Sequence, residues 1–350
     1  MTKTTGGNYF EDFKIGQALR HATPRTVTSG DVSLYSALYG SRFALNSSDE
    51  FARSLGLPRA PVDDLLVFHI VFGKTVPDVS LNAVANLGYA AGTFGAPVYP
   101  GDTLSTQSTV IGLKENSNRK TGVVYVRSVG TNQRGETVLD YCRWVMVRKR
   151  DEAANVPPAS VPDLPKTVAA ASLAIPAGLS LGKYDAAAAG SPHVWDDYAK
   201  GERIDHVDGM TIEEAEHQIA TRLYQNTARV HFNQHVEGQG RFGRRLVYGG
   251  HVISLARCLS FNGLANAFKL VAINGGQHVN PVFAGDTIYA WSEVLDKLEL
   301  PGRNDVGALR LRLVGVKNQA CAAFPYKQAD GTFDPAVALD FDYTALIKRR

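Results

Sequence analysis

Two short segments of this 350-residue chain combine residue types that can move a proton beside a developing negative charge. The first contains Asn226, Arg229 and His231, and the second contains the pair Gly249 and Gly250. A histidine of near-neutral pKa accepts or releases a proton, and glycines at a helix start offer backbone N–H groups to an oxyanion. Taken alone, however, His231 is explained more simply as a structural histidine held in a loop.

Other common catalytic arrangements are absent from the sequence. It has no P-loop, no GxGxxG segment after a strand and no GxSxG elbow, so nucleotide-phosphate and serine-hydrolase chemistry are not favoured. Most of the nine histidines have no catalytic context, and His69 in an apolar helix is expected to be a hydrogen-bonded core residue. Glu213 and His217 are spaced i, i+4, but no further ligand is in register, so we predict no metal site. The three cysteines are far apart and predict buried free thiols.

Helices are expected on either side of the His231 loop. One spans 212–223, where Thr211 and Glu214 have the spacing of a capping box. A more apolar helix over 250–261 follows the glycine pair and should be buried. The first half predicts matching helices over 31–38 and 64–74, and Asp63 and Asp64 fit a helix cap better than a proton carrier. Runs rich in β-branched and aromatic residues predict strands over 123–129, 139–147, 287–294 and 308–316.

These elements belong to an internal repeat. The segment 10–16 returns at 195–201, and 97–103 returns at 281–287, at offsets that agree within one residue. Between the copies, 151–192 has six prolines among many alanines and no amphipathic period, which indicates a linker lying across the surface. We therefore divide the chain into an N-terminal half (1–150), a linker (151–192) and a C-terminal half (193–350).

Composition limits the class of protein. Lys and Arg number 37 against 34 Asp and Glu, a net charge of +3, which gives no basic stripe for nucleic acid. With 44% hydrophobic residues the chain can bury a large core. No apolar run reaches the length of a membrane span, and the first residues do not resemble a signal peptide. We expect a cytoplasmic protein that binds neither nucleic acid nor membrane.

The loop around His231 resembles a motif of the MaoC-like, R-specific enoyl-CoA hydratases. The motif of that family reads Gly, Asp, any residue, Asn, Pro, an aliphatic residue and His. Val230 and His231 match its last two positions, and Asn226 stands where the family has a catalytic Asp. Ala228 and Arg229 replace Asn-Pro. The C-terminal half thus keeps the histidine but lacks the acid.

The first half carries a more degenerate copy, with Ser41 at the Asp position and Asn46 at the His position. The resemblance covers nearly all of the chain outside the linker. It implies an α+β, tandem (double) hot dog fold, in which each unit is a buried helix wrapped by an antiparallel sheet, with one active site per chain. Among two-unit members with a Pro/Ala-rich linker, the chain is most similar to the subgroup that interconverts mesaconyl-CoA plus water with β-methylmalyl-CoA in bacterial central carbon metabolism.

The resemblance implies a hydro-lyase and gives the candidate residues roles. His231 would move the proton of the attacking water, Asn226 would orient that water, and Gly249 and Gly250 would bind the thioester oxygen. Arg229 would pair with the free carboxylate of the substrate. A second carboxylate ~5 Å from that group would cost roughly 3 kcal/mol at an effective dielectric near 20, which accounts for an amide at position 226.

The acyl-CoA thioester is the expected partner, with coenzyme A as part of the substrate and no metal or redox cofactor. Arg241, Arg244 and Arg245 are candidates for its phosphates, although a solvated basic loop explains them equally well. A homodimer or larger homo-oligomer is expected, because sheet edges need covering. Three alternatives stay open: an R-specific hydratase of longer acyl chains, a thioesterase, and a non-catalytic acyl-CoA binding protein.

Overall fold

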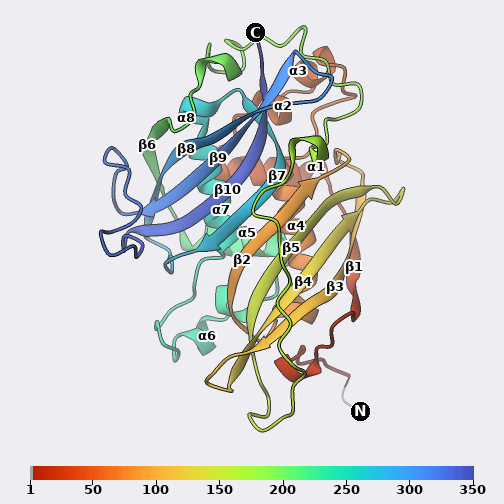
Figure 1. Ribbon diagram of the computed structural model, residues 1–350, viewed down its shortest axis with the longest axis vertical. Coiled ribbons are helices and arrows are strands. Elements are labelled where there is room, and N and C mark those ends of the chain that lie inside the picture. The colour runs from red at the N-terminus through yellow and green to blue at the C-terminus, as the bar shows by residue number, and fades with distance from the viewer. Residues whose placement is uncertain (1–2) are drawn as a thin grey trace.

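The computed structural model describes residues 3–350, which form a ten-stranded sheet in the order β1-β3-β4-β5-β2-β7-β10-β9-β8-β6 (Figure 1). The strands are β1 (Ala18–Thr26), β2 (Ala83–Phe94), β3 (Thr103–Glu115), β4 (Thr121–Thr131), β5 (Thr137–Arg148), β6 (Arg203–Thr211), β7 (Ala267–His278), β8 (Thr287–Glu299), β9 (Val306–Lys317) and β10 (Val337–Lys348). The helices are α1 (Ser29–Tyr39), α2 (Ala44–Ser47), α3 (Asp49–Ser54), α4 (Asp64–Thr75), α5 (Glu214–Leu223), α6 (Gln234–Glu237), α7 (Gly249–Leu259) and α8 (Phe261–Leu264).

The two halves of the chain meet edge to edge. Strands β1–β5 form one side of the sheet and β6–β10 the other, and the antiparallel pair β2–β7 joins them. Sequence reasoning left open whether the two sheets would meet at their edges or their faces. The edge pairing produces one continuous sheet, and places the start of β2 near the end of β7.

Helices α4 and α7 lie on the same face of this sheet (Figure 1). All residues of α4 are buried, and so are residues 250–258 of α7. Both helices pack with α1, α5 and the inward side chains of the strands in one large hydrophobic core. Each half is therefore a buried helix covered by five antiparallel strands, as the predicted double hot dog requires.

Most of the predicted elements are present, with small shifts at their ends. The predicted strands are parts of β4, β5, β8 and β9, and the predicted helices are α1, α4, α5 and α7. The predicted capping box of α5 is wrong, because Thr211 is the last residue of β6 and Glu213 is the N-cap. Asp63 caps α4 by accepting a hydrogen bond from the Leu65 N–H at 2.9 Å, as expected. Asp64 does not cap the helix, because its carboxylate pairs with Lys269 and accepts from the Leu270 N–H on β7.

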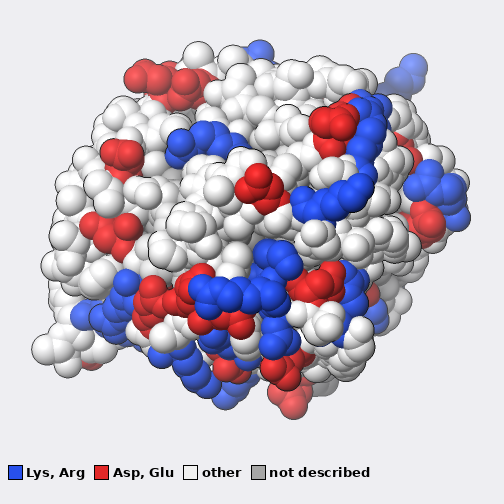
Figure 2. All heavy atoms as spheres, turned by 90° about the horizontal axis from the view of Figure 1, so that it is seen from above, with Lys and Arg blue, Asp and Glu red and all other residues white. Residues whose placement is uncertain are grey.

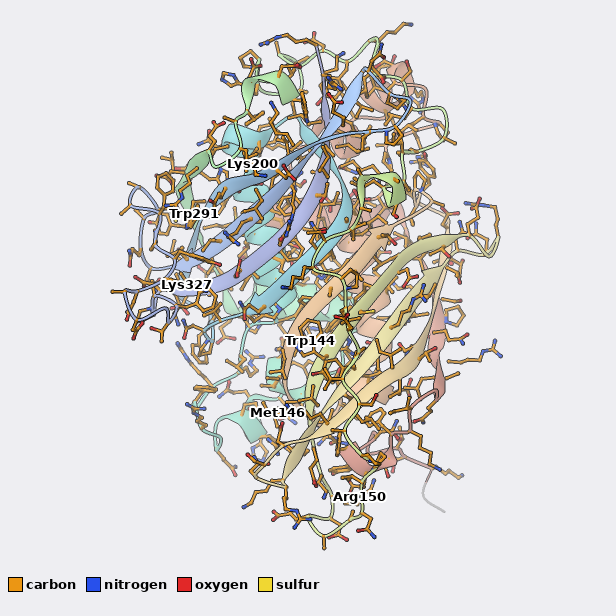
Figure 3. All side chains as sticks on the ribbon, in the orientation of Figure 1. Trp144, Met146, Arg150, Lys200, Trp291 and Lys327 are labelled. Atoms are coloured by element: carbon orange, nitrogen blue, oxygen red, sulfur yellow. The ribbon has the colours of Figure 1, made fainter. Side chains whose placement is uncertain are left out.

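The linker crosses the face of the sheet that lies opposite the helices (Figure 1). Ser160 pairs with Leu113 of β3, and the Val168 N–H donates to the Asn274 side chain on β7 at 2.8 Å. Trp144 is labelled in the middle of this face in Figure 3. The end of the linker does more than cover the surface, because Leu181 and Tyr184 are buried in a second hydrophobic cluster with α2, α3 and β7.

The prediction for the cysteines agrees with the structure. Cys142, Cys258 and Cys321 are buried free thiols. Within residues 3–350, no group of three or more His, Cys, Asp or Glu side chains could hold a metal ion, and no helix is long and apolar enough to cross a membrane. On the face shown in Figure 2, Lys and Arg side chains lie among Asp and Glu side chains. That face presents mixed charge, in keeping with the small net charge of the chain.

Candidate active site

A cavity of about 240 Å³ lies where the two halves meet. Its walls come from α4, the turn 76–80, β2 and β5 of the first half, and from 226–231, the start of α7 and 278–282 of the second half. Most of the lining is apolar, and its polar side chains are those of Ser80, Asn86, Tyr89, Arg143, Asn226, His231, Tyr248, His278 and Asn280. Neither half could build this cavity alone.

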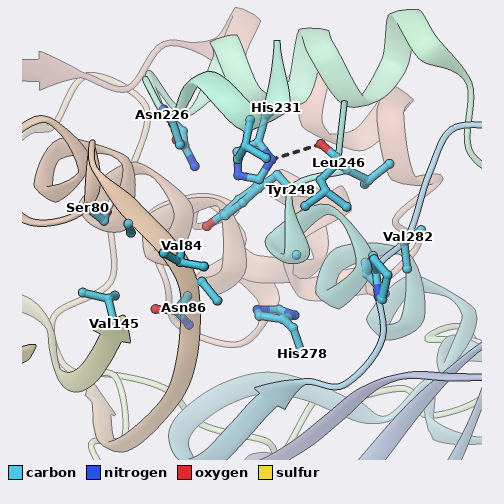
Figure 4. A pocket seen from close by; sticks show the side chains of 18 of the residues that line it. Ser80, Val84, Asn86, Val145, Asn226, His231, Leu246, Tyr248, His278 and Val282 are labelled. Carbon is cyan, nitrogen blue, oxygen red and sulfur yellow. Dashed lines mark hydrogen bonds between the residues drawn. The ribbon is translucent and has the colours of Figure 1, made fainter. Parts of the chain in front are cut away.

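His231 lines the cavity, and one hydrogen bond determines which of its ring nitrogens carries the hydrogen. It ends the short 3-10 turn Arg229–His231, and its Nδ1 lies 3.0 Å from the Leu246 carbonyl oxygen (Figure 4). A carbonyl oxygen only accepts, so Nδ1 carries the hydrogen and Nε2 keeps its lone pair. Burial lowers the pKa of His231 to about 4, against the opposing effect of the Leu246 hydrogen bond. At neutral pH this histidine is therefore uncharged and able to accept a proton.

Asn226 also lines the cavity, and its amide is oriented by its own loop. The Asn226 Oδ1 accepts a hydrogen bond from the Ala228 N–H at 3.0 Å, so the amide nitrogen is the end left for the cavity (Figure 4). The residue is 3% exposed. The preceding Gln225 adopts a left-handed backbone conformation, which ends α5 and turns the chain toward the cavity. Asn226 can thus donate a hydrogen bond to water or substrate.

The glycine pair makes room for three rings at the start of α7. A Cβ on Gly249 would lie 2.4 Å from Cε1 of His278, and a Cβ on Gly250 would lie 2.3 Å from Tyr248 and 2.5 Å from His69. Gly249 lines the cavity, whereas Gly250 does not. The first N–H groups of a helix have no intrahelical partner, so the N-terminus of α7 still presents donors beside the cavity. Sequence reasoning had given these glycines only the donor role.

His278 is a cavity residue that sequence reasoning did not select. It ends β7, and its Nε2 lies 3.0 Å from the Tyr89 hydroxyl of the other half. Burial, together with a smaller effect of the nearby His231, lowers the pKa of His278 to about 4. Burial also raises the pKa of Tyr89, so that phenol keeps its proton. The feature of the sequence that could have marked His278 as a candidate is its position shortly before the repeated segment 281–287.

His69 has the core role that the sequence predicts. It is fully buried, its Nε2 lies 2.9 Å from the Ser254 hydroxyl, and its Nδ1 lies 3.4 Å from the Tyr248 hydroxyl. Tyr35 bonds to the same serine at 2.8 Å. This network joins α1, α4 and α7 behind the cavity and holds the Tyr248 ring in its wall.

The predicted arginines lie outside the cavity lining. Arg229 is exposed and does not line it, which corrects its predicted pairing with a substrate carboxylate there. Arg245 forms an ion pair with Glu214. Arg241 and Arg244 are exposed, and the Arg244 guanidinium lies 4.1 Å from the centroid of the Phe283 ring, next to the cavity residue Val282.

Arg143 is the arginine that does line the cavity. It lies on β5, where residues 139, 141, 143, 145 and 147 are all buried. A charged residue in the inward phase of an otherwise apolar strand was the signal in the sequence that could have identified it. Arg143 and Asn86 were missed because strand pairing, and not sequence proximity, brings them to the site.

Comparisons with known proteins identify the family of this chain. A family model described as mesaconyl-CoA hydratase matches residues 1–325. The chain belongs to the mesaconyl-CoA hydratase family. Its predicted family and its predicted hydro-lyase class are thereby confirmed.

Two curated relatives match this family member along almost their whole length. The chain is 68% identical over 348 residues to a β-methylmalyl-CoA dehydratase of Chloroflexus aurantiacus, covering 99% of both chains. It is 62% identical over 349 residues to a mesaconyl-CoA hydratase of Cereibacter sphaeroides, covering 99% of this chain and 100% of the relative.

Solved structures confirm the fold of this mesaconyl-CoA hydratase family member. A crystal structure of a MaoC domain protein from C. aurantiacus superposes with a TM-score of 0.98 at 68% identity, over 100% of both chains. A double hot dog protein from Mycobacterium tuberculosis superposes with a TM-score of 0.76 at 26% identity, over 98% of this chain and 99% of the other. The predicted tandem hot dog fold is therefore correct.

Proposed function

We propose that this chain reversibly adds water to mesaconyl-CoA to give β-methylmalyl-CoA. The observation that carries the proposal is the uncharged His231, whose Nδ1–H is held by Leu246 and whose Nε2 is free for a proton. This histidine lies in the wall of a cavity assembled from both halves, within a member of the mesaconyl-CoA hydratase family.

The reaction forms a C–O bond at the carbon β to the thioester and a C–H bond at the α carbon. His231 Nε2 takes a proton from water as the water oxygen attacks the β carbon. Asn226 donates a hydrogen bond that orients the water. The electron pair of the double bond moves toward the thioester oxygen, and a proton returned from the histidine to the α carbon completes the addition. The reverse sequence dehydrates the product.

The start of α7 is where the thioester oxygen binds. The N–H groups of Gly249 and Gly250 and the positive end of the helix stabilise the enolate oxygen. His278 packs against Gly249, and its Nε2 lies 3.0 Å from the Tyr89 hydroxyl. We assign this hydroxyl as the donor, which places the hydrogen of His278 on Nδ1 and makes it available to the same oxygen. A donor on each side of the oxygen would then hold it in place.

The proposed reaction also concerns the binding of coenzyme A, cofactors and the oligomeric state. Arg241 and Arg244 provide cations for the phosphates of coenzyme A beside the Phe283 end of the cavity wall. None of these steps uses a metal or a redox cofactor. The predicted cytoplasmic location and homo-oligomeric state belong to this proposal, with the sheet edges β1 and β6 as the strands that an oligomer would cover.

The decisive experiment follows the ultraviolet absorbance of the enoyl thioester, with a chelator present. The purified protein is mixed with mesaconyl-CoA and separately with crotonyl-CoA, while free thiol is titrated. We expect the mesaconyl-CoA absorbance to fall faster than that of crotonyl-CoA, with no thiol released. Release of thiol would identify a thioesterase, faster loss of crotonyl-CoA would identify a hydratase of unbranched chains, and no change would indicate a binding protein.

A further inference from the structure

Arg143 is a buried cation without an acidic partner. Its side chain is 0% exposed, yet it lines the cavity. Its Nη2 donates to Thr75 at 2.7 Å and to Ser80 at 3.2 Å, its Nη1 lies 3.4 Å from Asn86 Oδ1, and its Nε has no partner. Within residues 3–350, no Asp or Glu forms an ion pair with it.

An uncompensated charge in this position is costly. Burying an ion the size of a guanidinium costs several kcal/mol unless an opposite charge or a full set of hydrogen bonds offsets it. The Phe72 ring, 4.3 Å from the guanidinium carbon, provides only a cation–π contact. A cation held in this way at a cavity wall indicates that an anion completes the site.

Ser80 and Asn86 connect the guanidinium to the cavity. Both line it, and both accept from Arg143 through their side-chain oxygens. Because each oxygen faces the arginine, the hydrogens of each group point elsewhere. Asn86 Nδ2 is a buried donor without a partner. Among the contacts of residues 3–350, the Ser80 hydroxyl accepts from Arg143 and donates to no other group. In Figure 4, Ser80 and Asn86 lie toward one end of the cavity and Val282 toward the other.

We propose that Arg143, Ser80 and Asn86 form the subsite that binds the free carboxylate of a dicarboxylic acyl-CoA. The Ser80 hydroxyl and the Asn86 amide donate to the two carboxylate oxygens, and Arg143 behind them supplies the positive charge. This assignment rests on the proposed function and replaces the exposed Arg229 as the carboxylate partner.

The position of the subsite fits the proposed reaction. In mesaconyl-CoA the carboxylate is attached to the carbon that receives water, so its subsite must adjoin Asn226. The end of α4 packs directly against that loop, because a Cβ on Gly73 would lie 3.3 Å from the backbone nitrogen of Asn226. Thr75, two residues farther along, accepts from Arg143. The carboxylate subsite and the loop that carries the water-binding amide are therefore neighbours in the wall of one cavity.

The subsite also predicts selectivity. A methyl group in place of the carboxylate would leave the Ser80 and Asn86 donors unpaired and the cation uncompensated. A site built to bind a polar group favours a ligand that carries this group over an analogue that lacks it by about 10⁴-fold. A four-carbon acyl-CoA that ends in a carboxylate should thus bind much more tightly than one that ends in a methyl group.

The test uses Asn86→Asp, which keeps the shape of the side chain and gives Arg143 its own carboxylate. Binding of succinyl-CoA and butyryl-CoA, which differ at the acyl terminus, is measured by calorimetry, and hydration of mesaconyl-CoA by absorbance. We expect succinyl-CoA affinity and mesaconyl-CoA kcat/KM to fall about 100-fold or more, while butyryl-CoA affinity changes less than about threefold. Asn118→Asp is the matched control, since Asn118 Oδ1 accepts only from Lys120 and Thr121 in the β3–β4 turn.

Two results would overturn the subsite: unchanged succinyl-CoA binding by Asn86→Asp, or an equal loss of both ligands by a folded variant. If circular dichroism shows that this variant is unfolded, Ser80→Ala decides, with an expected loss of about tenfold for succinyl-CoA alone. A wild-type protein that binds succinyl-CoA selectively but does not hydrate mesaconyl-CoA would refute the proposed function and leave the subsite standing. Hydration of mesaconyl-CoA without carboxylate selectivity would do the opposite.

Discussion

Replacing Gly249 by alanine tests whether the first residue of α7 must be glycine to admit the His278 ring. An added Cβ would lie 2.4, 2.5 and 2.6 Å from three atoms of that ring. Ordinary carbon contacts begin at about 3.4 Å, so the ring must move by about 1 Å. The backbone N–H groups of α7 are retained, and only the place of His278 changes.

The expected loss follows from that displacement. Misplacing a group of the active site by about 1 Å costs on the order of 100-fold in rate, which corresponds to about 3 kcal/mol in the barrier. We therefore expect Gly249→Ala to lower kcat for mesaconyl-CoA about 100-fold in the absorbance assay. Gly30→Ala is the matched control, because Gly30 is also in the first turn of a helix, and its added Cβ would only touch Thr28 Oγ1 at an ordinary 3.5 Å.

A double-mutant cycle separates the ring from other causes. Once His278→Ala has removed the ring, the methyl group at position 249 has room, so Gly249→Ala should cost nothing further. Full activity of Gly249→Ala would refute the reasoning about His278. An undiminished loss in the His278→Ala background would show that the methyl group disturbs the helix start or the oxyanion donors instead.

Four further predictions concern the catalytic residues and the stability of the fold. His231→Gln removes the proton acceptor and should lower kcat about 10²- to 10⁴-fold without loss of the folded circular dichroism spectrum. Asn226→Asp should lower kcat/KM for mesaconyl-CoA about 100-fold by repulsion of roughly 3 kcal/mol, and a variant as active as wild type would contradict this. Because the pKa of His231 is lowered to about 4, kcat/KM should stay constant from pH 8 to pH 5.5. If the histidine had an ordinary pKa, half of kcat/KM would be lost near pH 6.5. Burial also lowers the pKa of His206 to about 4, so this residue binds fewer protons in the folded state than in the unfolded state. The free energy of unfolding should therefore be fully retained above about pH 6.5 and fall as the pH decreases toward 4. Urea titration at several pH values measures this change.

The sequence by itself determined the repeat, the buried helices and the loop that contains the catalytic candidate. The copies at 10–16 and 195–201 predicted two similar units, and the apolar runs of α4 and α7 predicted buried helices, because continuous apolar patterns leave few alternatives. The motif that ends in His231 gave the family and the catalytic candidate. These features are local in sequence, so no knowledge of strand pairing was needed to find them.

Only the tertiary structure decided which side chains share the cavity. Antiparallel pairing of β2 with β7 and β5 brings Asn86, Arg143 and His278 together from three strands. Strand register and the packing of α4 against the Asn226 loop fix those distances, and neither can be deduced from spacing along the chain. Spacing along the chain also misled the prediction for Arg229. Its nearness in sequence to His231 does not determine which way a side chain on a 3-10 turn points.

The linker shows the same division. Its proline and alanine content predicted a connection lying across the surface, whereas the burial of its end depends on a partner surface. The second unit presents Phe268 and Val271 on β7, and Leu181 and Tyr184 of the linker pack against them. A composition rich in alanine and proline cannot reveal such a contact, because the apolar surface that accepts it belongs to a distant segment of the chain.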